Sequence, residues 1–125
     1  MADVTLHELR GRLDDEALAI LDVRSSHEFQ GVAGAHCDPR QGHIPGAVNL
    51  PLERLLQCSS AAEVRTLIGL PEGAEVVAYC HSGSRSGFAV DVLRGAGYDA
   101  RNYAGSWHEW SQDPNLPAEL AESGD

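Results

Sequence analysis

Glu75-Val-Val-Ala-Tyr79, followed directly by Cys80-His-Ser-Gly-Ser-Arg-Ser86, is the stretch that decides the fold. Its first part is apolar and β-branched, which is typical of a strand buried on both faces of a sheet. Residues 86–96 then carry apolar side chains at helical spacing, with Gly95 and Gly97 near the predicted end of the helix. The stretch therefore predicts a central strand, a loop and a helix that starts where the loop ends.

The rest of the chain repeats this alternation of strands and helices. Thr5 and Ser60 each precede a glutamate by three residues, and these capping boxes predict the first turns of two helices, the second running through Leu67. The other predicted strands are residues 17–23, 47–50 and 100–103, and the other predicted helices are residues 26–30 and 106–112. The alternation favours an α/β fold in which a parallel sheet carries helices on both faces. Ligands of such sheets bind at the carboxyl ends of the strands, so the loop after Tyr79 is the candidate site.

Length and charge limit the domain count and the partners. A chain of 125 residues fits a single domain, and we expect residues 1–125 to form it, with residues 113–125 as an acidic tail. The formal net charge is −10 and all nine basic residues are arginine, so the chain lacks the clustered positive charge that binds nucleic acid or a membrane surface. No apolar run approaches the ~20 residues that span a bilayer, and the first residues lack the apolar stretch of a secretory signal. We expect a cytoplasmic protein without nucleic-acid or membrane partners.

The three cysteines, Cys37, Cys58 and Cys80, do not form a C-x-x-C pair or suggest a disulfide framework. His36 beside Cys37 is a possible half of a metal site, but no second ligand pair follows at the spacing of zinc fingers. We therefore expect no metal and no cofactor, and no chemical role for Cys37 or Cys58.

The loop from Cys80 to Ser86 combines a nucleophile with a site for an anion. A loop that runs into a helix points free backbone N–H groups at one spot, backed by the positive end of the helix dipole. Gly83 lets the backbone curl, and Arg85 adds a permanent cation. Such surroundings lower a thiol's pKa, which predicts Cys80 as the catalytic nucleophile. The predicted substrate-binding residues of the loop are His81, Ser82, Gly83, Ser84, Arg85 and Ser86, whose N–H groups, hydroxyls or guanidinium face the anion. The imidazole of His81 either tunes the thiol or faces solvent.

Four motifs, in order along the chain, resemble those of the rhodanese superfamily. They are Leu21-Asp-Val-Arg24 with Glu28-Phe29, Gly42-His-Ile-Pro-Gly-Ala47 with Asn49 and Pro51, Tyr79 to Ser86, and Asn102-Tyr-Ala-Gly-Ser-Trp-His-Glu-Trp110. The chain is similar to the catalytic half of two-domain thiosulfate sulfurtransferases standing alone. The resemblance implies an α/β domain whose central parallel sheet has five strands.

The resemblance also implies an activity. Enzymes of this family move sulfane sulfur through a cysteine persulfide, here on Cys80, from thiosulfate or a persulfide donor to cyanide, a thiol or the cysteine of a partner protein. By the same resemblance Arg24 is a second candidate to bind the anionic donor. An ion pair of Arg24 with Asp22 or Glu28 is an equally open interpretation.

Two other functions stay open. One is a sulfur carrier that delivers sulfur to a fixed protein partner with little turnover on small molecules. The other is a phosphatase or arsenate reductase of the same fold. The spacing from Cys80 to Arg85 is C-x4-R, one residue shorter than the C-x5-R of the phosphatases, and the smaller ring suits a single sulfur atom better than a phosphate. The loop also lacks the Gly-Val-Thr ending of mercaptopyruvate-type enzymes, which disfavours that donor.

Overall fold

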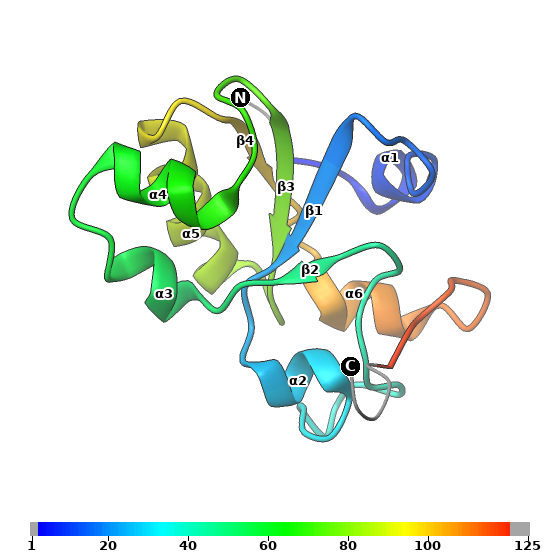
Figure 1. Ribbon diagram of the computed structural model, residues 1–125. Helices are drawn as coiled ribbons and strands as arrows, with labels where there is room; N and C mark the ends of the chain where they lie inside the picture. Colours follow the sequence, from blue (N-terminus) through cyan, green and yellow to red (C-terminus); the bar gives the residue numbers. More distant parts are fainter. Residues whose placement is uncertain (1–2, 121–125) are drawn as a thin grey trace.

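The computed structural model describes residues 3–120, which form a four-stranded parallel sheet with helices packed on both faces (Figure 1). The strands are β1 (Leu18–Asp22), β2 (Val48–Asn49), β3 (Glu75–Tyr79) and β4 (Asp99–Asn102), in the order β2-β1-β3-β4. The helices are α1 (Leu6–Arg10), α2 (Ser26–Gln30), α3 (Leu52–Leu56), α4 (Ala61–Ile68), α5 (Ser84–Gly95) and α6 (Ser106–Gln112). The predicted α/β class is confirmed.

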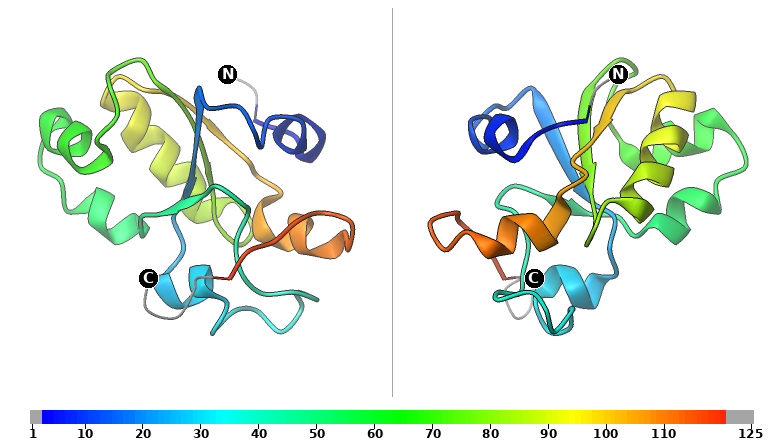
Figure 2. Two further views of the ribbon diagram at one scale, coloured as in Figure 1. Left: turned by 45° about the vertical axis from the view of Figure 1, so that its right-hand side comes forward. Right: turned by 180° about the vertical axis from the view of Figure 1, so that it is seen from behind.

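Alternating side chains of the central strand separate two hydrophobic cores. Val76 and Ala78 of β3 are buried against α3, α4 and α5, because successive residues of a strand point to opposite faces. Val77 and Tyr79 are buried on the other face, against α1 and α6. Figure 2 shows these two helical layers on either side of the sheet, and it shows α2 beyond the carboxyl ends of the strands. Both layers therefore meet the sheet at β3, the strand that ends at Cys80.

The predicted fifth strand is absent from residues 3–120. The outer edge of β4 accepts one backbone hydrogen bond there, from Val4 N–H to the Asn102 carbonyl oxygen at 2.9 Å. A single bond does not make a ladder, and the chain turns into α1 at Leu6. The strand count implied by the resemblance is therefore wrong by one, while the parallel order of the central strands holds.

Side-chain caps mark the starts of two of the predicted helices. The hydroxyls of Thr5 and Ser60 accept hydrogen bonds from the N–H groups of Glu8 and Glu63, both at 3.1 Å, as the capping boxes predicted. The α3 helix was not predicted, because it begins after Pro51 with no side-chain cap and no capping box marks its start.

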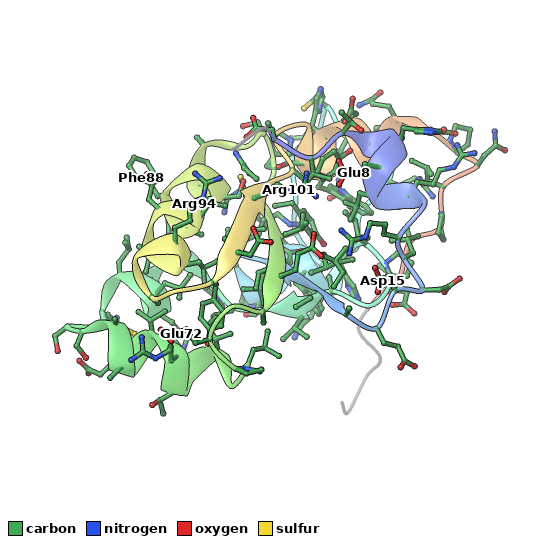
Figure 3. The ribbon with its side chains drawn as sticks, turned by 90° about the horizontal axis from the view of Figure 1, so that it is seen from above. Glu8, Asp15, Glu72, Phe88, Arg94 and Arg101 are labelled. Atoms are coloured by element: carbon green, nitrogen blue, oxygen red, sulfur yellow. The ribbon has the colours of Figure 1, made fainter. Side chains whose placement is uncertain are left out.

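A network of ion pairs holds α1 against the sheet. Glu8 of α1 pairs with Arg101 of β4, and Figure 3 shows these two side chains next to each other. Arg12, after α1, pairs with Glu75 at the start of β3 at 2.6 Å. These groups are partly exposed, so each pair contributes little to stability, but together they connect α1 to two strands.

The first part of the predicted acidic tail is packed on the domain. Trp110 Nε1 donates to the Pro117 carbonyl at 2.7 Å, and Leu116 is buried in the core under α6. Glu119 and His43 exchange backbone hydrogen bonds of 2.8 and 2.9 Å. The predicted tail is therefore packed against the domain as far as Glu119, and residues 121–125 lie outside the described residues. Within residues 3–120 no helix is both long enough and apolar enough to cross a membrane.

Candidate active site

The candidate loop joins the carboxyl end of β3 to the amino end of α5. Gly83 is the N-cap of α5 and has a left-handed backbone with φ 97°. A Cβ at this position would lie 2.6 Å from the Ala104 carbonyl oxygen. Both the backbone conformation and the space therefore require glycine, and the helix begins at Ser84, two residues earlier than predicted.

The sulfur of Cys80 receives hydrogen bonds from both ends of this turn. The N–H of Gly83 lies 3.1 Å from Sγ, the N–H of Ser86 lies 3.4 Å away, and the Ser86 hydroxyl lies 3.3 Å away. Cys80 is 1% exposed and Ser86 is fully buried. The loop thus surrounds the sulfur with donors that would stabilise a negative charge on it.

These donors lower the pKa of the thiol. Burial alone would raise the pKa of Cys80, but the hydrogen bonds from the Ser86 hydroxyl and from the N–H groups of Ser86 and Gly83 outweigh it, and the pKa lies below its usual value. The thiolate is the nucleophilic form of cysteine. The arrangement therefore increases the fraction of Cys80 that is present as thiolate at a given pH. Ser82 and Ser84 are exposed, and the Ser82 backbone N–H adds a smaller contribution that lowers the Cys80 pKa.

Arg85 is paired with a carboxylate from another element. Its two terminal nitrogens donate to the two oxygens of Glu28 at 2.9 and 3.2 Å. Glu28 also completes the capping box of α2 with Ser25. Burial would raise the pKa of Glu28, but the hydrogen bonds from Arg85 and Ser25 lower it to about 2. The pair fixes the guanidinium beside the loop, and the Arg85 side chain remains 38% exposed.

Arg24 does not reach the loop as a free cation. Its guanidinium donates to both oxygens of Asp22, the shortest contact being 2.7 Å, and to the Gly42 carbonyl. The residue is 1% exposed, and its guanidinium carbon lies 5.7 Å from the ring centre of Tyr79 and 5.3 Å from that of Trp107. The geometry of Arg24 is thus that of a buried ion pair with Asp22, one of the two interpretations that the sequence left open.

Ser106, which the sequence analysis did not single out, supports Cys80 from the start of α6. Its hydroxyl accepts a hydrogen bond from the Cys80 N–H at 3.0 Å and donates to the Tyr103 carbonyl at 2.8 Å. Its backbone is left-handed at φ 56°, which is strained for a residue other than glycine and typical of functional sites. Its only signal in the sequence was its place inside the motif from Asn102 to Trp110.

The amino end of α6 is also joined to the loop through the backbone. The N–H groups of Trp107 and His108 donate to the carbonyls of Cys80 and His81, both at 2.9 Å. The His81 ring turns toward Asp38, with Nε2 3.1 Å from Oδ1. The His81 side chain is 25% exposed, and its imidazole belongs to a cluster beside the loop that also contains Asp38.

The Cys80 thiol lies between a parallel strand and a helix and accepts hydrogen bonds from backbone N–H groups. This arrangement is typical of α/β domains whose cysteine carries a charged sulfur or binds an oxyanion. Comparison with known proteins identifies the family within this class. The model of the rhodanese-like domain matches residues 5–113, and the chain belongs to this family.

Two relatives are named thiosulfate sulfurtransferase. A thiosulfate sulfurtransferase of Azotobacter vinelandii is 38% identical over 122 residues, covering 90% of this chain and 44% of the relative. One of Pseudomonas aeruginosa is 33% identical over 133 residues, covering 94% of this chain and 48% of the relative. The chain thus spans about half the length of the curated relatives it matches.

Solved structures agree with the fold. The crystal structure of a probable thiosulfate sulfurtransferase superposes with a TM-score of 0.80 at 46% identity, covering 94% of this chain and 47% of the other. An anaerobic ergothioneine biosynthesis enzyme from Chlorobium limicola has a TM-score of 0.81 over 94% of this chain and 28% of its own. At 21% identity the second similarity shows the fold alone.

Proposed function

We propose that this protein is a sulfurtransferase that carries sulfane sulfur as a persulfide on Cys80. The observation that carries the proposal is the sulfur itself, which accepts hydrogen bonds from Gly83 and Ser86 at the amino end of α5. The names of the relatives support thiosulfate as a donor. The three free cysteines fit a reducing compartment, and we propose the cytoplasm.

The proposed cycle has two displacement steps and needs no oxidant. The Cys80 thiolate attacks the outer sulfur of thiosulfate, a bond between the two sulfurs forms, and sulfite leaves with the electron pair of the broken S–S bond. An acceptor such as cyanide or a thiolate then attacks the terminal sulfur of the persulfide, and the Cys80 thiolate is regenerated. Covalent catalysis of this kind gives ping-pong kinetics.

The loop suits the charge that each step creates. The donors on Sγ would hold the thiolate before transfer and the anionic persulfide after it. No general acid is needed, because sulfite leaves as a stable anion. The exposed part of Arg85 is the proposed contact for the anionic end of the donor, at short range against a net charge of −10.

Delivery to a protein acceptor is the second candidate, and one surface feature favours it. A hollow of about 390 Å³ borders the loop and is lined by Gly83, Ser84, Gly87, Phe88 and Asp91. Phe88 is 64% exposed and projects outward from α5 (Figure 3). An exposed aromatic ring beside a reactive cysteine is a feature that a docking protein can use.

Intact-mass measurement after mixing with thiosulfate tests the proposal. We expect one added sulfur atom on the wild type, its removal by cyanide with formation of thiocyanate, and no adduct on Cys80→Ser. Cys58→Ser is the matched control and should load like the wild type. Complete loading with little thiocyanate turnover would favour the carrier, and hydrolysis of an aryl phosphate faster than sulfur transfer would refute the sulfurtransferase.

A further inference from the structure

Four side chains that commonly bind metals meet beside the catalytic loop. They are Cys37 and Asp38 from the loop between α2 and β2, His81 from the catalytic loop and His108 from α6. One ligand atom from each lies within 4.8 Å of all the others. The sequence predicted no metal because these ligands come from three distant segments, and only the fold brings them together.

The separations are close to those of a tetrahedral zinc site. Nδ1 of His108 lies 2.8 Å from Oδ1 of Asp38 and 3.8 Å from Sγ of Cys37. Nε2 of His81 lies 3.1 Å from the same Asp38 oxygen. Ordinary bond lengths from zinc to sulfur, nitrogen and oxygen place tetrahedral ligand atoms roughly 3.3–3.6 Å apart. Small side-chain movements would therefore place all four ligands on one ion.

The Asp38 carboxylate is the second observation that points to a ligand. Its side chain is 1% exposed, and Oδ2 accepts no hydrogen bond although it lies 3.0 Å from Nε2 of His81. A buried carboxylate oxygen without a partner is costly, and a bound cation removes that cost. The two imidazoles that face Asp38 are the common neutral ligands of such a cation.

The loop that carries Cys37 and Asp38 is held in place independently of these ligands. Arg40 donates to the carbonyls of Leu116 and Asp113, both at 2.8 Å. In return Trp107 Nε1 donates to the Arg40 carbonyl at 2.9 Å. The loop is thus fixed against α6, which makes the four ligands a preorganised set.

We propose that Cys37, Asp38, His81 and His108 bind one divalent transition-metal ion, with Zn²⁺ as the best fit. A thiolate, two imidazoles and a carboxylate suit a borderline ion with tetrahedral preference, and they do not suit Mg²⁺ or Ca²⁺, which take oxygen ligands. Cys37 is exposed and loses its proton on binding, so the ion can enter from solvent. The bound ion would connect the residue after the nucleophile to two other segments.

Metal binding by the untagged protein, in a non-thiol reductant, tests the site directly. We expect one equivalent of Zn²⁺ in competition with a chromophoric chelator. We also expect Co²⁺ to give visible bands of tetrahedral coordination and a thiolate charge-transfer band. Cys37→Ser should abolish the charge-transfer band and weaken Zn²⁺ binding at least about tenfold, and His108→Ala should weaken binding to a similar extent.

Three matched variants keep the result specific. His36→Ala and Cys58→Ser remove potential ligands outside the cluster, and both should bind Zn²⁺ like the wild type. Cys80→Ser should also bind normally, which separates this site from the sulfur-transfer thiol. Absence of stoichiometric binding, unchanged affinity in Cys37→Ser, or a charge-transfer band that depends on Cys80 would each overturn the proposal.

Discussion

Replacing Ser86 by alanine should raise the pKa of the catalytic thiol without disturbing the loop. The Ser86 hydroxyl lies 3.3 Å from Cys80 Sγ, and the Ser86 N–H, which alanine keeps, lies 3.4 Å away. A hydrogen bond to a charged group contributes about 1.5–3 kcal/mol. Because the contact is long, we take the lower value, which corresponds to a rise of about one pKa unit.

The rate of persulfide formation should follow from this shift. Well below the pKa, Ser86→Ala has about one tenth of the wild-type thiolate, and since each thiolate is up to about threefold more nucleophilic, loading by thiosulfate should be about three- to tenfold slower. At high pH both proteins are fully ionised, and the more basic thiolate of the variant should be up to about threefold faster, since nucleophilicity rises with pKa. The two pH–rate profiles should therefore cross, whereas structural damage would lower the rate at every pH.

The pKa can be measured from the ultraviolet absorbance of the thiolate, and the rate from quenched intact-mass samples. The background for both is Cys37→Ser with Cys58→Ser, so that Cys80 is the only thiol. Ser84→Ala is the matched control, because its exposed hydroxyl makes no hydrogen bond to the sulfur. Equal pKa values for Ser86→Ala and the wild type would refute the role assigned to the hydroxyl.

Three further changes test the surroundings of the loop. Because Glu28 has its pKa lowered from 4.5 to about 2, its pair with Arg85 stabilises the fold above about pH 4.5 and is lost as the pH falls toward 2. Glu28→Gln should therefore reduce the free energy of unfolding in urea by about 1–2 kcal/mol at neutral pH, after allowance for solvent screening. Near pH 2 the substitution should change it by almost nothing, and a difference that does not depend on pH would contradict the role of the pair. Gly83→Ala should cost about 1–3 kcal/mol in thermal unfolding and slow persulfide loading, whereas Gly95→Ala, in open space on α5, should do neither. Arg24→Met leaves the buried carboxylate of Asp22 without its ion pair and should lower the free energy of unfolding by about 3–5 kcal/mol. A variant of normal stability whose only change is a raised KM for thiosulfate would show instead that Arg24 binds the substrate.

Local sequence signals predicted the parts of the fold that local interactions determine. Thr5 and Ser60 cap helices because each hydroxyl satisfies an N–H group three residues away. The strand ending at Tyr79 was predicted from its composition, which fits burial on both faces of the sheet. The α3 helix has no cap and is stabilised by contacts with α5, so nothing within its own residues marked it.

In the candidate site, too, the sequence predicted the local contacts and missed those from distant segments. The turn from Cys80 to Ser86 was predicted because its donors and its sulfur lie within one short segment. The partner of Arg85 is on α2, and the hydroxyl that supports the Cys80 backbone comes from Ser106. Sequence spacing carries no information about such contacts, because the register of the sheet and the packing of α6 create them.

The dependence of the Cys80 and His81 carbonyls on Trp107 and His108 has a consequence during synthesis. A ribosome-bound chain that has emerged only as far as α5 already contains the cysteine, the glycine and the first turn of the helix. It lacks the segment that fixes the base of the turn. We therefore expect the loop around Cys80 to reach its final geometry only after residues 106–108 have emerged and packed against its backbone.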